Sequence, residues 1–243
     1  MCGIAGVFAP QIDPNLRSSI IKSMCNALKH RGPDAHGIYS DSEITLGHQR
    51  LSIIDVDERS NQPMSDPTGR YILSFNGEIY NFQQLKSLLT EYRFITNSDT
   101  EVLLALYIKF GHSCIEKLKG QFSLAIWDAN DKSLFIARDR LGEKPFFYNL
   151  SNGVFIFASE LKALCTSKLI DIDISKRSIL DLLVHESVKS PKTIIDNVFQ
   201  LPPGSYALVK NGMLSITQYW SAGCASKVFF EEKYDIVCKN INR

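Results

Sequence analysis

The chain opens with a cysteine directly after the initiator methionine, and an almost wholly apolar run, Gly3 to Phe8, follows it. A half-exposed strand alternates apolar and polar side chains, so an unbroken apolar run predicts a short strand that is buried on both faces. Such a strand places Cys2 at its open end. The first residues therefore predict an interior strand with the Cys2 thiol at its N-terminal end.

Capping residues and leucine-rich stripes predict three helices. The first begins at Asp13-Pro14, an N-cap followed by a proline at the first helical position, and it ends before Arg31. The others cover 82–91 and 99–110, the last one after the capping box Ser98-Asp99-Thr100-Glu101.

Short runs rich in β-branched and aromatic residues predict strands around these helices. They cover 44–48, 71–75, 122–128, 133–138, 154–158, 205–209 and 213–220. Polar turn signals such as Ser151-Asn152-Gly153 join neighbouring strands as hairpins. Because helices and strands come in blocks, we expect the α+β class with antiparallel sheets.

Charge and cysteine content argue against several kinds of function. The 243 residues include 27 basic and 26 acidic side chains, so we expect no one-signed surface for nucleic acid or anionic lipid. The six cysteines lack the close paired spacing of zinc sites, so we predict no metal site and a reduced, cytoplasmic setting. No stretch reaches the roughly 20 apolar residues of a membrane span.

Cys2 becomes the N-terminal residue if Met1 is removed, and a thiol and an α-amine then share one residue. A free α-amine has a pKa of about 7.7–8.0 and can take the thiol proton near neutral pH. This arrangement predicts a nucleophile with its own base. The alternative is a buried or incidental cysteine.

The segment Phe75-Asn76-Gly77-Glu78 is interpreted as a strand that runs into an Asn-Gly corner before a helix. Such a corner can aim the Asn76 side-chain amide and the Gly77 N–H at one point, as a tetrahedral oxyanion requires. An ordinary Asn-Gly turn is the alternative.

Two charged residues are candidates for binding a zwitterion. Arg50 lies in an apolar segment, where an unpaired guanidinium is costly, so it should have an anionic partner: a substrate carboxylate or an internal Asp or Glu. Asp99 lies at a predicted helix start, where it serves either as a first-turn acid or as the partner of a substrate ammonium.

The charged loops Arg31-Gly32-Pro33-Asp34 and 138–145 identify no reaction, and salt bridges are their expected use. The five histidines are scattered without a metal-ligand pattern and are predicted to be structural.

Taken together, ordered motifs along the chain resemble the glutaminase domain of the asparagine synthetase family, a class II glutamine amidotransferase and N-terminal nucleophile hydrolase. They are Met1-Cys2-Gly3-Ile4-Ala5-Gly6, Arg31-Gly32-Pro33-Asp34, Gly47-His48-Gln49-Arg50-Leu51-Ser52-Ile53-Ile54-Asp55, Asn76-Gly77-Glu78-Ile79-Tyr80-Asn81, Ser98-Asp99-Thr100-Glu101, Gly120-Gln121-Phe122, Ala137-Arg138-Asp139, Gly142 with Lys144-Pro145, Ala158-Ser159-Glu160-Leu161-Lys162-Ala163-Leu164, Leu201-Pro202-Pro203-Gly204 and Tyr219-Trp220.

This resemblance implies a four-layer α/β/β/α sandwich of two antiparallel sheets. It also implies residue roles toward L-glutamine. Cys2 would attack the carboxamide, and Asn76 with the Gly77 N–H would hold the oxyanion. Arg50 would bind the α-carboxylate, Asp99 with Glu78 the α-ammonium, and the backbone of Leu51, Ser52, Ile53 and Ile54 would line the pocket.

Relatives of this family continue into a domain that binds ATP and magnesium and adenylates aspartate, and no loop of that kind occurs here. We therefore expect a glutaminase domain over 1–220, a linker or truncated tail over 221–243, no cofactor in this chain, and a C-terminal or separate synthetase domain as partner. A homodimer is left open. The alternatives are the glutaminase half of another amidotransferase, with an amino-sugar or surface-polysaccharide acceptor, and a catalytically silent binding module.

Overall fold

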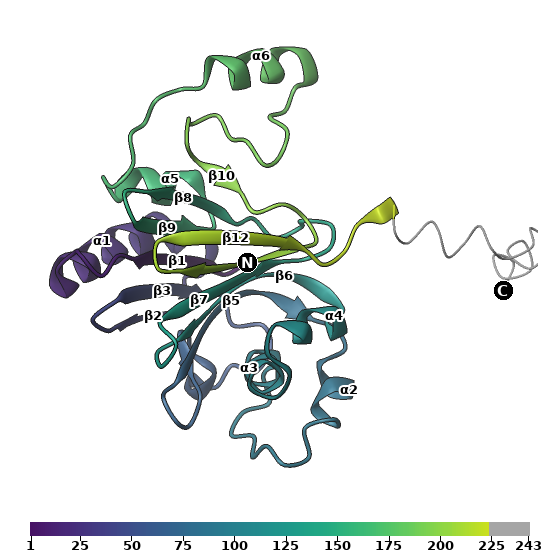
Figure 1. Ribbon diagram of the computed structural model, residues 1–243. Coiled ribbons are helices and arrows are strands. Elements are labelled where there is room, and N and C mark those ends of the chain that lie inside the picture. Colours follow the sequence, from purple (N-terminus) through teal and green to yellow (C-terminus); the bar gives the residue numbers. More distant parts are fainter. Residues whose placement is uncertain (224–243) are drawn as a thin grey trace, which may run out of the picture.

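Two six-stranded antiparallel sheets form the centre of the computed structural model, which describes residues 1–223 (Figure 1). The first sheet runs, in spatial order, β10 (Phe199–Gln200), β8 (Phe147–Ser151), β9 (Val154–Ala158), β1 (Gly3–Phe8), β3 (Ile44–Arg50) and β2 (Ala35–Ser40). The second runs β12 (Met213–Gln218), β11 (Ser205–Lys210), β7 (Ser133–Arg138), β6 (Gly120–Asp128), β5 (Tyr71–Ile79) and β4 (Met64–Ser65).

Helices cover the outer face of each sheet. The first sheet is covered by α1 (Pro14–Ala27) and α5 (Leu161–Thr166), and the second by α2 (Phe82–Lys86), α3 (Asp99–Phe110) and α4 (Cys114–Lys117) (Figure 1). The expected four-layer sandwich is therefore confirmed. One further helix, α6 (Lys176–His185), projects away from the four layers (Figure 1).

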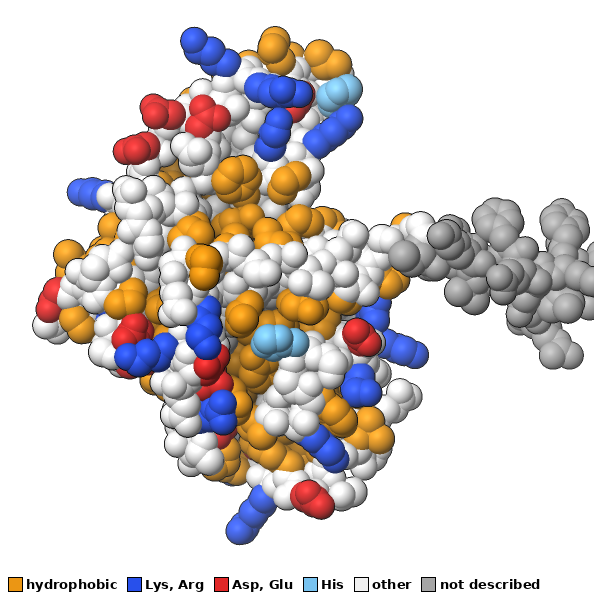
Figure 2. Space-filling model, in the orientation of Figure 1, with side chains coloured by type: hydrophobic (Ala, Val, Ile, Leu, Met, Phe, Trp, Pro, Cys, Tyr) orange, Lys and Arg blue, Asp and Glu red, His pale blue; other side chains and the backbone are white. Residues whose placement is uncertain are grey.

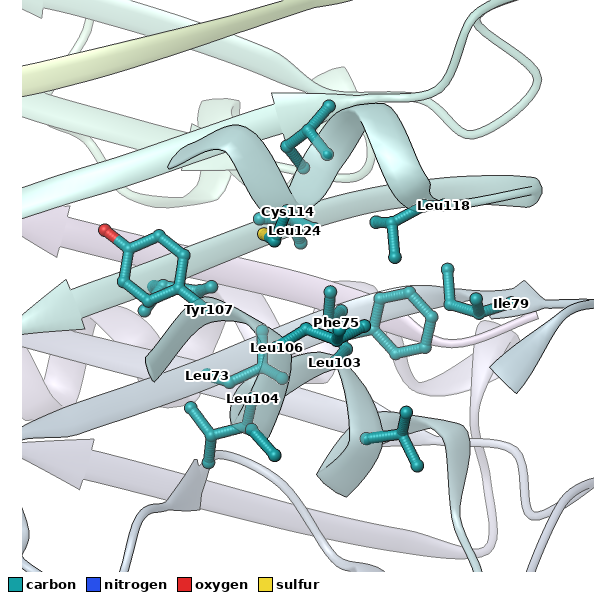
Figure 3. Packing of buried hydrophobic residues seen from close by; sticks show 14 of the residues in the cluster. Leu73, Phe75, Ile79, Leu103, Leu104, Leu106, Tyr107, Cys114, Leu118 and Leu124 are labelled. Carbon is teal, nitrogen blue, oxygen red and sulfur yellow. The ribbon is translucent and has the colours of Figure 1, made fainter. Parts of the chain in front are cut away.

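Each pair of adjacent layers encloses its own apolar cluster. Aromatic residues such as Trp127, Phe146 and Phe157 fill the space between the sheets. Leucines of α3 pack with Phe75 and Leu124 between the second sheet and its helices (Figure 3). All six residues of β1 are buried, as its apolar sequence predicts.

The N-terminal strand and helix follow their sequence signals. Asp13 caps α1, because its carboxylate accepts from the N–H groups of Asn15 and Leu16, and Pro14 occupies the first turn. Gly47 lets α1 lie close to β3, since a Cβ there would come within 2.4 Å of the Cys25 sulfur.

Other elements depart from the expectations. Strand β5 continues through Asn76 and Gly77 to Ile79, so the predicted Asn-Gly corner is wrong; pairing with β6 as far as Gly120 outweighs the local turn preference. Strands β2, β4, β8 and β10 and helices α4, α5 and α6 were not predicted, and α2 ends at Lys86 instead of residue 91. The predicted tail extends into 224–243, outside the described residues.

Arg17 ties the start of α1 to two neighbouring segments although it is fully buried. Its guanidinium donates to the carbonyl oxygens of Ala9 at 2.7 Å, Ile12 at 2.8 Å and Asp41 at 2.6 Å. A buried carbonyl without a donor is costly, so these three bonds hold the ends of β1 and β2 against the helix.

Replacing Arg17 by methionine keeps the aliphatic volume but leaves the carbonyl oxygens of Ile12 and Asp41 without the guanidinium donor, and that of Ala9 with the Ile12 N–H alone. We expect Arg17→Met to lower the free energy of unfolding by roughly 2–4 kcal/mol, measured by urea denaturation. Lys22→Met on the exposed face of α1 is the control and should change it by less than about 0.5 kcal/mol. Equal losses would show that the buried bonds contribute no net stability.

Candidate active site

Cys2 lies where β1 begins, at the edge between the two sheets, and its side chain lines a pocket. The residues that line this pocket come from both sheets, from the loop after β3 and from the start of α3. They are Met1, Cys2, Arg50, Leu51, Ile53, Ile54, Ser60, Gln62, Phe75, Asn76, Gly77, Glu78, Asp99, Thr100 and Lys144. Every predicted site residue except Ser52 is among them.

The Cys2 thiol is partly buried and bonded to one neighbour. Its sulfur accepts from the Leu51 N–H at 3.4 Å and lies 3.7 Å from the Leu51 carbonyl oxygen, while Arg31 Nε donates to the Cys2 carbonyl at 2.9 Å. Burial raises the pKa of the Cys2 thiol, and the Leu51 N–H, the terminal amine and Arg50 oppose that rise. The thiol therefore needs a base before it can act as a nucleophile.

Along one edge of β5, beyond the short strand β4, backbone N–H groups have no strand partner. The Phe75 N–H donates to Gln62 Oε1 at 2.6 Å, and the Ile79 N–H donates to Asp99 Oδ2 at 3.0 Å. Side-chain oxygens therefore satisfy the backbone N–H groups of this edge on either side of Gly77.

Gly77 presents its N–H on the same edge, because alternate residues of a strand point their peptide groups the same way. Its partner on β6, Phe122, uses its own N–H and C=O for Asp139 on the far side, so Gly77 is not bonded across the ladder. A Cβ at Gly77 would lie 2.2 Å from the Gln121 carbonyl oxygen, so only glycine fits. The Gly77 N–H is thus directed at the pocket.

Asn76 supplies a second donor. Its side chain is 1% exposed, and Nδ2 has no hydrogen-bond partner within residues 1–223. Buried amide N–H groups are nearly always paired, so this orphan in a pocket wall is a site for an acceptor that a ligand brings. Asn76 and Gly77 together offer two donors to one pocket.

Arg50 has partners other than those expected from the sequence. Its guanidinium donates to the carbonyl oxygens of Asp57 at 3.0 Å and of Asp55, and to Asn61 Oδ1 at 2.7 Å. No carboxylate pairs with it within the described residues, so the predicted internal Asp or Glu is wrong. These bonds use three of its five N–H donors and leave two for a ligand.

Asp99 lies both in the first turn of α3 and in the pocket wall. It is the first residue of α3, after the N-cap Ser98, and is 4% exposed. Burial raises the pKa of Asp99 to about 6, against the opposing effect of the N–H groups of Ile79 and Thr100. Glu78 lines the same pocket and raises the pKa further. A cation bound here would stabilise the ionised form of the Asp99 carboxylate.

Several pocket residues were not predicted from the sequence: Ser60, Gln62, Phe75, Thr100 and Lys144. Phe75, Thr100 and Lys144 belong to motifs that stood out, the Phe75-Asn76-Gly77-Glu78 segment, the capping box 98–101 and the charged loop 138–145, whereas Ser60 and Gln62 belong to none. Among residues 1–223 no salt bridge involves the loop 138–145, because Arg138 and Arg140 donate to backbone carbonyls, and Arg138 also to the Gln200 side chain. In the other charged loop Arg31 does form an ion pair, with Glu160 at 2.9 Å.

Within residues 1–223 no cluster of three or more His, Cys, Asp or Glu side chains could hold a metal ion. In the same part of the chain, no helix combines the length and apolar character needed to cross a bilayer.

Sequence comparisons identify relatives over the same region. Residues 1–220 match the family described as "Glutamine amidotransferase domain". "Asparagine synthetase [glutamine-hydrolyzing] 1" of Bacillus subtilis is 39% identical over 227 residues, which are 91% of this chain and 36% of that protein. "Asparagine synthetase B [glutamine-hydrolyzing]" of Escherichia coli is 40% identical over 167 residues, 68% of this chain and 30% of that protein. The chain spans about a third of the length of these relatives.

A solved structure shares the fold. The glutamine phosphoribosylpyrophosphate amidotransferase of Bacillus subtilis superposes on 90% of this chain and 49% of its own, with a TM-score of 0.66 and 18% identity. The layered sheets thus agree with that structure, and the sequence relatives add the assignment at family level. The chain belongs to the class II glutamine amidotransferase domain family and is homologous to the glutaminase half of asparagine synthetases.

Proposed function

We propose that this chain hydrolyses L-glutamine to glutamate and ammonia, with Cys2 as the nucleophile once Met1 has been removed. The observation that carries the proposal is the convergence of Cys2 with two unclaimed donors, Asn76 Nδ2 and the Gly77 N–H, on one pocket. A nucleophile and an oxyanion site are the minimum that acyl transfer requires.

The reaction is expected to run in two stages. The α-amine of Cys2 takes the thiol proton, and the sulfur attacks the carboxamide carbon of glutamine. The carbonyl oxygen becomes an oxyanion that accepts from Asn76 and Gly77. The C–N bond then breaks, the amine returns the proton to the leaving group, ammonia departs, and a thioester remains. Water attacks the thioester with the same amine as base, which releases glutamate and restores the thiol.

The amino-acid end of glutamine has matching partners. The two free N–H donors of Arg50 suit the α-carboxylate, and Asp99, with Glu78 beside it, suits the α-ammonium. The ammonium would stabilise the ionised form of the buried Asp99, so binding offsets the cost of burying that carboxylate. Leu51, Ile53 and Ile54 supply pocket wall between these charges and Cys2.

Met1 lines the same pocket, and its amine is one peptide bond away from the position that a proton relay requires. With Met1 in place, about 60 Å³ is open to the centres of water molecules, enough for only a few waters. Removal of Met1 would create the Cys2 amine and add room for substrate. Retention of Met1 would instead favour the alternative of a silent binding module.

We also propose that the ammonia passes to a synthetase domain, C-terminal or separate, and that any need for ATP and magnesium lies there. The support is that the relatives named above are glutamine-hydrolysing synthetases about three times longer than the region they share with this chain. The acceptor is aspartate in this proposal. Another carboxylate or a sugar acceptor is the alternative.

The four cysteines described are unpaired thiols, as a reduced cytoplasmic setting would allow.

Helix α6 offers a surface for such a domain. Leu180, Leu183 and Val184 form one stripe, and they are 62%, 74% and 72% exposed. Apolar side chains gather at the tip of the molecule, over α6 (Figure 2). A ten-residue helix with its apolar stripe in water has little reason to be stable alone. So small a patch suits a partner held nearby by the same chain better than a second free copy.

Cys2→Ala should abolish ammonia release from glutamine without unfolding the chain, because only one sulfur is lost. The measurement is enzyme-coupled detection of ammonia, alongside intact-mass analysis of Met1 removal and a thermal melt. Cys165→Ala, at another partly buried thiol, is the control and should retain full activity. Ammonia release by Cys2→Ala at the parent rate would remove Cys2 from the reaction.

Asp99→Asn should separate stability from substrate binding. An ionised carboxylate whose pKa stands at about 6 instead of 3.8 costs the fold on the order of 3 kcal/mol at neutral pH. The variant should therefore gain roughly 1–3 kcal/mol in unfolding free energy there, while KM for glutamine rises at least about tenfold.

The gain in unfolding free energy of Asp99→Asn should depend on pH in a defined direction. The folded chain holds the Asp99 proton more tightly than the unfolded chain, so the advantage of Asp99→Asn should be greatest above pH 6 and vanish as the pH falls through 3.8. Asp131→Asn, at an exposed ion pair with Lys210, is the control and should alter neither stability at neutral pH nor KM. An unchanged KM in Asp99→Asn would contradict the ammonium role.

Replacing Leu180, Leu183 and Val184 by serine tests the partner surface. In a hybrid where this chain replaces the matched region of Bacillus subtilis asparagine synthetase 1, we expect glutamine-dependent product formation to fall, while glutaminase and ammonia-dependent activity persist. The control carries serine at Leu88, Ile95 and Met213, which lie elsewhere on the surface and are 51%, 59% and 70% exposed. Identical behaviour of the two triple variants, or a dimer of the free chain that only the α6 variant dissociates, would contradict the assignment.

A further inference from the structure

We infer that His48 and Gln62 are positioning residues that hold the Asn76–Gly77 donors in register with the rest of the pocket. The inference rests on the proposed glutaminase function. It concerns two buried side chains that have no part in the chemistry as written above. Both act on the backbone of a single residue, Phe75, directly before Asn76.

Strand β5 needs outside help at Phe75. Its short neighbour β4 pairs only with Ile72 and Leu73, so β5 has no strand on that side from there on. The Phe75 N–H and C=O point to this open edge and are buried with the side chain. Unpaired buried peptide groups would be costly, and strand ends without a neighbour move easily. The oxyanion donors begin one residue later.

His48 satisfies the carbonyl from the opposite sheet. It lies on β3, is fully buried, and its Nε2 is 3.0 Å from the Phe75 carbonyl oxygen. A carbonyl only accepts, so Nε2 carries the proton and Nδ1 is the bare nitrogen, which has no partner within the described residues. Burial lowers the pKa of His48 to about 4, with Arg50 acting in the same direction, so the ring stays neutral at working pH.

Gln62 satisfies the N–H from a third segment. Its Oε1 accepts from the Phe75 N–H at 2.6 Å, and its Nε2 makes a longer contact of 3.4 Å with Thr100 Oγ1. Gln62 is 6% exposed and its side chain is therefore fixed between strand and helix. Thr100 follows Asp99 at the start of α3.

These bonds connect the three parts of the pocket. His48 joins the strand that carries Arg50 to the strand that carries Asn76, and Gln62 joins that second strand to the helix that begins at Asp99. A misplacement of about 1 Å in a reacting group can cost on the order of 100-fold in rate. His48 and Gln62 thus fix the oxyanion donors relative to the two groups that grip the amino-acid end of the substrate.

The test replaces each residue by an apolar one and by one that keeps the donor. His48→Leu and Gln62→Met remove the bonds, and His48→Gln retains an N–H that can reach Phe75. We expect kcat to fall on the order of 100-fold in the first two, with KM within about threefold, and His48→Gln to stay within about tenfold of the parent. Gln49→Leu is the control, because Gln49 makes a buried bond of 3.0 Å to the Cys25 carbonyl, away from the pocket.

Two readouts separate positioning from general damage. Alkylation of Cys2 by iodoacetamide forms no oxyanion, so its rate should be unchanged in His48→Leu and Gln62→Met. Amide hydrogen exchange at Phe75 and Gly77 should accelerate in Gln62→Met, whether or not the chain is a glutaminase. A parent chain that releases no ammonia would defeat the proposed function alone, and the exchange result would still decide this inference.

The inference is overturned if Gln62→Met leaves kcat and exchange at the parent level. It is also overturned if Gln49→Leu loses as much kcat as His48→Leu, or if Cys2 alkylation slows in parallel with kcat. If His48→Leu does not fold, Gln62→Met alone decides, because it removes the other of the two side-chain bonds to the Phe75 backbone.

Discussion

The open edge of β5 is the constraint on which the candidate site depends. A strand that loses its neighbour inside a protein must find other partners for its peptide groups, since water does not reach them. Here Gln62 and Asp99 take the N–H groups on either side of Gly77. The unpaired N–H of Gly77 therefore lies between two backbone N–H groups that side chains satisfy. Cys2 lines the same pocket because β1 begins at this border between the sheets.

Buried arginines hold the loops around this edge by an unusual use of charge. Arg17, Arg50 and Arg138 each donate to backbone carbonyls of neighbouring segments, in place of pairing with a carboxylate. A guanidinium has five donors in a rigid plane, so one side chain can satisfy several carbonyls of an irregular loop at once. The loop after β3 takes its course from Arg50, and that course forms one wall of the pocket.

Local signals predicted the α+β class, the antiparallel sheets and the candidate site residues, while the four-layer arrangement and the residue roles came from the family resemblance. Asp13-Pro14 marks a helix start, and the apolar run after Cys2 marks an interior strand. Asn76 and Gly77 were picked out for their chemistry, yet as a corner, because turn preference is local while pairing with Gly120 is not. The partners of Arg50, the role of Gln62 and the place of Lys144 in the pocket wall depend on loops whose paths only the folded chain defines. No periodic pattern encodes them.

The place of Met1 in the pocket has a practical consequence for producing the protein. Any affinity tag, fusion partner or residual cleavage scar ahead of Cys2 would lie at the pocket mouth and convert the amine that the proposed reaction uses into an amide. Recombinant material handled in that way would fold normally and still give a blank assay. The protein should therefore be produced in a host with ample methionine aminopeptidase, or released by a protease that leaves Cys2 as the N-terminal residue. Only then would inactivity of a purified sample count against the proposed function.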